Sequence, residues 1–328
     1  SSASNRRTWT WSGWIKRCTF GAVHDLFSAY DGSAYNIIRI GNNDQLNFQS
    51  NTAAIKLTNA KLRDPSAWYH IVVSVDTTNS TAADRVIIYI NGARQTLATD
   101  NSVSENTDYA FNTTNAHTLG VYANGSSYDF DGYMAEINFI DGLQYDPSYF
   151  GETDLITGQW NPKKYVGSYG TNGYYLNFSD NSGTTATTLG KDSSGNGNNF
   201  TPNNFSVSAG VGNDSVTDTP TNNFATLNPL SLTGAGGTFS NGNLDFTADS
   251  NYATRTGNIS LKTGKWYWEI TITNIGTDLH GIVQGTHPNG NTYPGYDTNG
   301  NVKGIGWFSG SGGLLYGAVP DGATNGAT

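Results

Sequence analysis

Apolar and polar residues alternate over short stretches along most of the chain, and β-branched and aromatic residues fill many of the apolar positions. This pattern predicts strands over residues 8–15, 35–40, 68–75, 86–90, 133–140, 174–178 and 266–272. Asn-Gly and Asp-Gly pairs recur between these stretches, and both readily adopt the positive φ of tight hairpin turns. Residues 146–150 could form one helical turn after Pro147, but no longer stretch has the spacing of an amphipathic helix. The sequence therefore predicts an all-β, antiparallel sandwich of the jelly-roll type.

The first predicted strand carries three tryptophans. Trp9 and Trp11 fall on one face, and the apolar positions then shift at Gly13 to Trp14 and Ile15, which predicts a β-bulge at the glycine. Exposed rings at these positions would form a platform for sugars. Alternating tryptophans on one face are also what a sandwich interior requires, and we expect them in the core.

The density of strand signals divides the chain into three zones. Residues 1–150 hold most of them, residues 151–225 are looser, and the pattern returns over residues 226–328. The middle zone still contains aromatic residues such as Trp160, Tyr165 and Tyr174. We therefore expect it to be an irregular connecting segment that packs on the first domain rather than a free tether.

Composition and charge exclude several classes of protein. Charged residues make up 13% of the 328 residues, against an average of about 25%, which argues against coiled coils and long surface helices. Aromatic residues make up 12%, which argues against disorder. The net charge is −9 without any Lys/Arg-rich run, so we expect no nucleic-acid partner, and the apolar runs are too short to predict membrane insertion. The single cysteine, Cys18, excludes an intrachain disulfide and is expected in the core.

Four pieces of the first zone carry a family resemblance. They are WYHIVVSVD from residue 68, IYING from residue 88, LG at 119–120 and FDGYMAEI from residue 130. In this order and spacing they resemble the laminin-G-like members of the concanavalin A-like lectin/glucanase superfamily, over residues 8 to about 150. The resemblance implies a two-sheet antiparallel jelly roll at residues 1–150 that binds glycans or proteins.

Two further resemblances cover the rest of the chain. The succession that begins with DGYMAEINFIDG and continues through WNPKKY, YGTNGYYLNFSDNS and DSVTDTPTNNF, between residues 131 and 244, resembles virion structural proteins of tailed phages, particularly marine ones, described as tail-fibre or appendage proteins. The stretch GKWYWEI, followed by Gly304-Ile305-Gly306-Trp307, resembles the N-terminal part of a SPRY domain, another β-sandwich binding module. This implies a partial SPRY-like sandwich at 226–328, with a buried strand that places Trp266 and Trp268 on one face.

If the first sandwich binds a glycan, we expect the site on loops at one rim. Sugar faces stack on exposed aromatic rings, while Asn and Asp side chains bond the hydroxyl groups. The candidates beside predicted turns are Tyr30, Asp31, Tyr35, Tyr122, Asn124, Tyr128 and Asp129. We expect no cofactor and no metal: the five histidines lack zinc spacing, and residues 192–197 lack the closing Glu of an EF-hand loop and predict a turn.

The superfamily also includes glycoside hydrolases, whose retaining members need two carboxyl groups about 5 Å apart. Glu136 and Asp141 are on the matching strand, but their spacing puts them on opposite faces of a regular strand. Strand alternation assigns one face to Tyr133, Ala135, Ile137 and Phe139 and the other to Met134, Glu136, Asn138 and Ile140. We expect no catalytic role for Glu136 and no enzyme activity. A Ser-His-Asp triad stays open, although no Gly-x-Ser-x-Gly elbow occurs.

Three functions compete at this point. The first is a virion structural protein, a tail-fibre or appendage subunit that presents binding modules to host-surface glycans or neighbouring virion proteins. The second is a virion-associated polysaccharide depolymerase, and the third is a capsid-decorating or head-fibre protein. The phage resemblance implies a location on the tail or capsid surface and a homo-oligomer, most commonly a trimer.

The ends of the sequence predict a longer gene product. Laminin-G-like jelly rolls usually open with a strand that pairs near the FDGYMAEI strand, yet only seven residues, most of them polar, precede Thr8. At the other end, the SPRY-like segment stops before it can supply a facing layer for Trp266, Trp268 and Trp307.

Overall fold

The computed structural model describes residues 3–123, 125, 127–210, 212–231, 233–234, 236–249, 253–271, 279–284, 303–308 and 314–318. The chain divides into two compact units, Ser1–Ala225 and Thr226–Thr328, and each is described by itself. The described residues contain two short 3-10 turns as their only helices, η1 (Ala82–Asp84) and η2 (Pro147–Tyr149), and neither could cross a membrane. The second turn lies where the sequence predicted a single helical turn.

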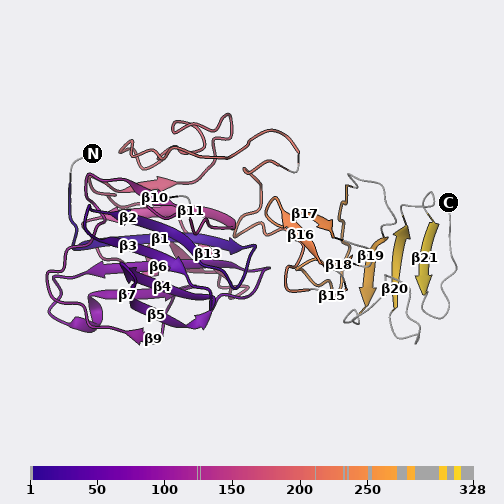
Figure 1. Ribbon diagram of the computed structural model, residues 1–328, viewed down its shortest axis with the longest axis horizontal. Helices are drawn as coiled ribbons and strands as arrows, with labels where there is room; N and C mark the ends of the chain where they lie inside the picture. The colour runs from indigo at the N-terminus through magenta and orange to yellow at the C-terminus, as the bar shows by residue number, and fades with distance from the viewer. Residues whose placement is uncertain are drawn as a thin grey trace. The chain divides into compact units, whose positions relative to one another are not determined.

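Two six-stranded antiparallel sheets make up most of the first unit (Figure 1). Sheet A consists, in spatial order, of β14 (Tyr174–Leu176), β11 (Gly132–Asp141), β1 (Thr8–Arg17), β6 (Trp68–Asp76), β7 (Val86–Ile90) and β8 (Ala93–Arg94). Sheet B consists of β10 (His117–Leu119), β2 (His24–Tyr30), β3 (Tyr35–Ile40), β4 (Gln45–Ser50), β5 (Ala53–Lys61) and β9 (Leu97–Asp100). The predicted all-β antiparallel sandwich is confirmed.

Aromatic side chains fill the space between the two sheets. Trp9 and Trp11 of β1 are fully buried there, as the alternation predicted. The ring centroid of Phe111 lies 4.8 Å from that of Trp9 and 4.7 Å from that of Phe27 in sheet B. Burial of rings of this size is a main source of stability for a sandwich.

The predicted β-bulge is real, but its extra residue lies on the neighbouring strand. β1 keeps one alternation through Gly13, whose Cα pairs with Ile71 of β6 without interruption. On β11, Glu136 and Ile137 together face Gly13, and Glu136 adopts a φ of 52°. A side chain at Gly13 would meet the Ile137 Cδ1 at 2.6 Å, which explains the glycine. The expectation that the apolar phase of β1 itself shifts is therefore wrong.

The bulge also corrects the predicted faces of β11. Ile137 and Phe139 point into the core as expected, whereas Met134 packs against the core and Tyr133 lies on the outer face of sheet A, with its ring 6.3 Å from that of Trp68. The extra residue reverses the alternation of every position before it. Regular two-residue periodicity could not reveal this.

Residues 145–169, which we call the middle segment, cover part of the outer face of sheet A. Phe150 and Tyr165 pack with Val72 and Ile140 in a second apolar cluster on that face. A short hairpin of β12 (Gly151–Thr153) and β13 (Trp160–Pro162) lies in this segment. Trp14 is therefore buried on the outer face, not in the core between the sheets, and its ring stacks on His70 with centroids 4.9 Å apart.

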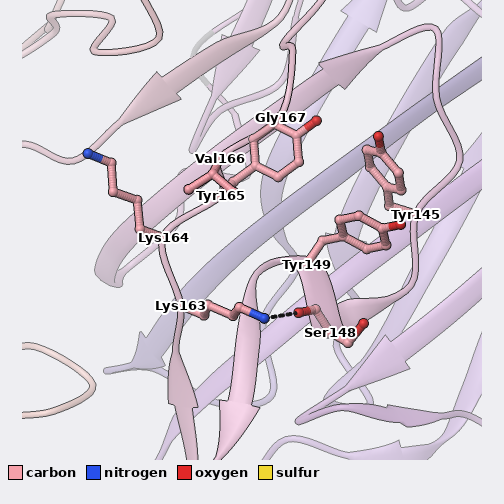
Figure 2. A pocket seen from close by; sticks show the side chains of 8 residues that line it. All are labelled: Tyr145, Ser148, Tyr149, Lys163, Lys164, Tyr165, Val166 and Gly167. Carbon is pink, nitrogen blue, oxygen red and sulfur yellow. Dashed lines mark hydrogen bonds between the residues drawn. The ribbon is translucent and has the colours of Figure 1, made fainter.

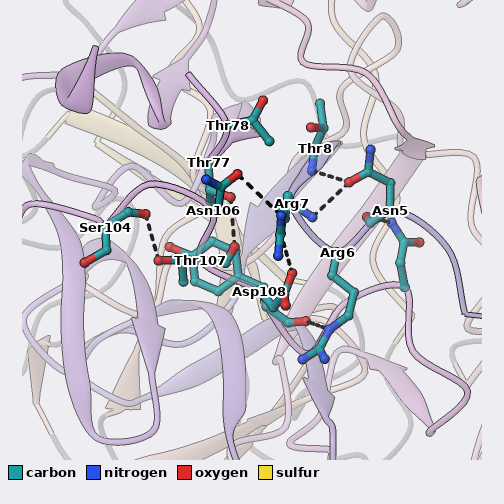
Figure 3. Close-up of polar contacts among 12 residues, drawn as sticks. Asn5, Arg6, Arg7, Thr8, Thr77, Thr78, Ser104, Asn106, Thr107 and Asp108 are labelled. Atoms are coloured by element: carbon teal, nitrogen blue, oxygen red, sulfur yellow. Dashed lines mark hydrogen bonds and ion pairs between the residues drawn. The ribbon is translucent and has the colours of Figure 1, made fainter. Parts of the chain in front are cut away.

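The edge of β11 is occupied by β14, which pairs Leu176 with Ile137 and Tyr174 with Phe139. The sequence led us to expect a further strand near this edge, upstream of the given residues; the described residues before β1 form no strand, and the upstream strand stays a prediction. Instead, the residues before β1 bind the loop at 104–109 (Figure 3). Arg7 Nε donates to the Asp108 carboxylate at 2.7 Å, and Arg6 Nε donates to a backbone carbonyl of the same loop at 2.6 Å.

The described residues of the second unit form three small antiparallel sheets. They pair β15 (Thr233–Gly234) with β18 (Ala253–Thr254), β16 (Gly237–Ser240) with β17 (Asp245–Ala248), and β19 (Leu279–Gln284) with β20 (Lys303–Phe308) and β21 (Leu314–Ala318). The Gly304–Trp307 stretch of the SPRY resemblance lies in β20, although its side chains lie outside the described residues.

The strand predicted over 266–272 is wrong for residues 266–271, and position 272 lies outside the described residues. No strand is assigned at 266–271, and Trp266 and Trp268 are 58% and 52% exposed. Alternating aromatic residues fit a half-buried strand, but a strand also needs a pairing partner, and none of the described residues pairs with this stretch. The expected burial of these two rings on one strand face is wrong for the same reason.

Candidate functional site

The outer face of sheet B carries a mixture of aromatic and polar side chains. On β3, Ile38 and Ile40 point into the core, so Tyr35, Ile37 and Arg39 lie on the opposite face by strand alternation. Tyr35 and Arg39 are half-buried there. The loop at 120–131 runs beside this face. The backbone N–H of Asp25 in β2 donates to the Tyr128 carbonyl of this loop at 2.8 Å and so joins the two.

Four predicted site residues meet on this face in a group that we call the tyrosine cluster. Tyr30 ends β2 and Tyr35 begins β3, and the two are directly opposite in the ladder, with ring centroids 4.2 Å apart. Tyr122 stacks on Tyr35 at 4.7 Å, and Tyr128 meets Tyr122 edge-on at 6.0 Å. Tyr128 is 48% exposed and presents much of its ring to solvent. The hairpin and the 120–131 loop thus build one continuous aromatic surface.

Asp31 has a structural place beside the cluster. Its Oδ1 accepts from the backbone N–H groups of Ser33 and Ala34, and its Oδ2 forms a 2.6 Å ion pair with Arg6. Desolvation alone would raise the pKa of Asp31, but these hydrogen bonds outweigh it and hold the pKa below the usual value. Both oxygens are therefore already engaged in shaping the turn.

Asp129 and Asn124 are the remaining two predicted site residues. Asp129 is exposed, and its backbone carbonyl lies 2.8 Å from the Nδ1 of His24. Asn124 lies outside the described residues. A role in binding stays a prediction for both.

Sequence reasoning missed Arg39 and its partner Asp25. Arg39 donates through Nε and Nη2 to the two oxygens of Asp25 at 2.6 and 2.9 Å, and its guanidinium lies 4.8 Å from the centroid of the Tyr128 ring. Desolvation raises the pKa of Asp25, and the Arg39 hydrogen bond opposes that rise. Alternation with Ile38 and Ile40 indicates that Arg39 faces outward, but only the β2–β3 pairing shows which carboxylate it meets.

An amide group completes this part of the face. Asn47 of β4 is the ladder partner of Arg39. Its Nδ2 donates to the Gln49 side chain at 3.1 Å, and its Oδ1 has no hydrogen-bond partner among the described residues. A buried acceptor of this kind is costly unless something donates to it. The Asn47 Oδ1 is itself buried, so this face presents to a ligand aromatic rings and a guanidinium that is already paired with Asp25.

The sandwich also contains a serine–histidine pair, on the opposite sheet. Ser12 Oγ and His70 Nε2 are 2.9 Å apart, and His70 Nδ1 lies 2.9 Å from the indole Nε1 of Trp160. An indole can only donate, so Nδ1 accepts and the ring proton is on Nε2, which donates to Ser12. Because His70 cannot then accept the serine proton, and both residues are fully buried, this pair does not form a nucleophile and base.

The carboxylates considered from the sequence are engaged in structural hydrogen bonds. Glu136 Oε2 accepts from the Tyr175 hydroxyl at 2.6 Å, and the Asp141 oxygens accept from the Asn112 amide and the Asn172 backbone N–H at 3.0 Å each. At the 192–197 turn, Asp192 accepts from backbone N–H groups within the turn and in β14. Among the described residues, no three His, Cys, Asp or Glu side chains are placed to hold a metal ion.

Comparison with known proteins agrees with this architecture. The family described as the concanavalin A-like lectin/glucanases superfamily, laminin-G type, matches residues 1–143. The first sandwich has a concanavalin A-like fold. No curated protein matches the sequence.

Solved structures with some similarity to this chain include three from different organisms. They are a candidate carbohydrate binding protein from Bacteroides ovatus (16% identity, TM-score 0.33), the heptameric SAP-like pentraxin of Limulus polyphemus (13%, 0.34) and the CBM40 of the Ruminococcus gnavus IT-sialidase (14%, 0.34). The matches cover 48%, 44% and 44% of this chain and 51%, 69% and 80% of the respective structures. The chain thus spans about half the length of the Bacteroides ovatus protein.

Proposed function

We propose that this protein is a glycan-binding subunit of a tailed-phage virion and that the tyrosine cluster of its concanavalin A-like domain contacts the sugar. The observation that carries the glycan proposal is the convergence of Tyr30, Tyr35, Tyr122 and Tyr128 with Arg39 on one partly exposed face. Lectin-type folds provide such faces, but one fold hosts many functions, so these side chains rather than the fold support glycan binding.

The geometry indicates how a sugar would be held. The carbon-bound hydrogens of a pyranose ring would pack on the exposed Tyr128 ring, which is stiffened by the guanidinium of Arg39 beside it. The hydroxyl groups would then be bonded by polar groups beside this ring, such as the exposed Asp129 carboxylate. The polar contacts fix the orientation, while the ring contact supplies most of the affinity.

The binding test uses the full chain and polysaccharide from the host envelope, immobilised for equilibrium titration. Tyr128→Ala and Tyr35→Ala should each weaken binding about tenfold, which corresponds to the loss of about 1.4 kcal/mol of ring contact. Phe205→Ala is the matched control, because Phe205 is an exposed aromatic residue of the first unit, 53% accessible, and does not belong to the cluster. Unchanged affinity in both cluster variants, with unaltered circular dichroism, would refute the cluster as the binding face.

The virion part of the proposal is supported by the phage-like succession of motifs between residues 131 and 244. On this proposal the protein lies on the tail or capsid surface, forms a trimer, contacts other virion proteins, and carries a SPRY-like second sandwich as a further binding module. Antibody labelling of intact particles should decorate the tail or the head, and light scattering of the full gene product should give a trimer mass. Unlabelled particles would contradict the virion role without affecting the glycan titration.

A further inference from the structure

A second hollow lies in the segment that covers sheet A, away from the tyrosine cluster. It has a volume of about 420 Å³ and is formed by two short stretches, 145–149 and 163–167 (Figure 2). Its lining consists of Tyr145, Ser148, Tyr149, Lys163, Lys164, Tyr165, Val166 and Gly167. The volume is within the range of sites that hold a small ligand.

The aromatic side of this pocket is preorganised. Tyr145 and Tyr149 stack with ring centroids 3.9 Å apart, and Tyr165 lies 5.8 Å from Tyr145. Tyr165 is buried in the apolar cluster on sheet A, and its hydroxyl donates to the Ser168 carbonyl at 2.9 Å. Tyr149 is 44% exposed. A fixed stack with one accessible ring can receive the flat face of a ligand without first being ordered.

The charge at the pocket is positive, in a chain with a net charge of −9. No Asp or Glu is among the lining residues, and none of the ion pairs formed by described residues includes Lys163 or Lys164. Lys163 Nζ donates to the Ser148 carbonyl at 3.2 Å and so points toward Ser148, whereas Lys164 extends away from it (Figure 2). The nearby Asp146 carboxylate accepts from the Ser148 N–H at 2.8 Å, where it caps the η2 turn.

We infer that this pocket binds the anionic residue of an acidic glycan, a sugar that bears a carboxylate or a sulfate. The ammonium group of Lys163 is held in place by one hydrogen bond and has two further N–H donors for the anion. The Tyr149 ring offers the face on which the sugar packs. The inference concerns a different face from the tyrosine cluster and different residues, so it holds or fails independently of the proposed function.

The test compares three oligosaccharides of equal length in calorimetric titrations of the full chain: an oligogalacturonate, a sulfated oligogalactose and the neutral oligogalactose. The wild-type protein should bind at least one of the two acidic ligands about tenfold more tightly than the neutral one, because only an acidic ligand can form a charged hydrogen bond with Lys163. Whichever acidic ligand binds identifies the anion. Equal binding of all three ligands, or of none, would overturn the inference.

Two variants assign the binding to this pocket. Lys163→Gln should reduce the affinity for the acidic ligand about tenfold and leave the weak binding of the neutral ligand unchanged. Lys61→Gln removes an exposed charge from the end of β5 and should have no effect. Tyr35→Ala should also leave acidic-ligand binding intact, which separates this site from the tyrosine cluster. Wild-type affinity in a folded Lys163→Gln variant would place the acidic ligand elsewhere.

Discussion

Acidification from pH 6.5 to pH 5 should weaken the first unit through one buried histidine. His70 is fully buried, and burial lowers its pKa from 6.5 to about 3. Its Nδ1 already accepts the indole N–H of Trp160, so a second ring proton would face another donor. In the unfolded chain the same imidazole takes up a proton near pH 6.5.

The magnitude follows from this difference in proton uptake. Between pH 6.5 and pH 5 the unfolded state binds the extra proton and the folded state does not, so the stability falls with decreasing pH. At 1.36 kcal/mol per pH unit, the loss from His70 at pH 5 is about 2 kcal/mol. The stabilisation is fully present above pH 6.5 and decreases until the folded pKa near 3. Burial also lowers the pKa of His117, which adds to the slope in the same direction.

Urea unfolding at pH 5, 6 and 7, followed by tryptophan fluorescence, measures this dependence. The free energy of unfolding of a folded His70→Gln variant should vary less with pH than that of the wild type, by about 2 kcal/mol at pH 5. His117→Gln is the matched control and should keep the His70 part of the slope. Above pH 5 the titration of carboxyl groups such as Asp108, whose pKa the Arg7 hydrogen bond lowers, contributes little.

An NMR titration of the histidine rings gives a second measurement that does not depend on the variant. The His70 ring should stay neutral down to pH 5, with its proton on Nε2. A ring that becomes charged near pH 6.5 in the folded protein, or an identical pH dependence of unfolding in the wild type and His70→Gln, would refute the reasoning.

Two further substitutions test the packing of β1. Gly13→Ala should lower the free energy of unfolding by about 1–3 kcal/mol, because the new Cβ would lie 2.6 Å from Ile137 Cδ1, whereas Gly125→Ala meets nothing within 4 Å and should be close to neutral in thermal unfolding. Asp218→Ala leaves the fully buried ammonium group of Lys16 without its 2.7 Å partner and should cost about 3–5 kcal/mol in urea unfolding. The double variant Lys16→Met/Asp218→Leu should regain most of this loss, and a double variant no more stable than Asp218→Ala would contradict a charge-burial penalty.

The six strands predicted in the first unit are all present, because the pattern that marks them is local, whereas β2, β4, β5, β9 and β10 of sheet B were not predicted. Trp9 and Trp11 alternate on one face of β1, and both are buried between the sheets. Because only one face of this part of β1 contacts the core between the sheets, its apolar residues recur at every second position of the sequence. The same periodicity cannot show that one extra residue at Glu136 reverses the faces of β11 before it.

The second face of sheet A shows where local patterns end. Trp14 looked like a shift of the apolar phase, but it is the regular outer-face residue of β1 and is buried beside His70. His70 in turn stacks on Trp160, which follows it by 90 residues in the sequence. The Trp160 indole N–H donates to the His70 imidazole. The cover comes from a segment with few strand signals, so no periodicity near Trp14 could indicate it. In the second unit the opposite error arises: Trp266 has the pattern of a buried strand but is exposed.

The same distinction governs the candidate site. Turn chemistry places Tyr30 and Tyr35 at a hairpin, and the ladder then sets their rings face to face. The meeting of Arg39 with Asp25, and of both with Tyr128, depends on which strand and which loop lie alongside, and this information is not local. Aromatic content alone therefore does not separate a binding face from a core face. The separation comes from what covers each sheet: the middle segment buries the aromatic outer face of sheet A, whereas the tyrosine cluster on sheet B keeps the exposure that a ligand requires.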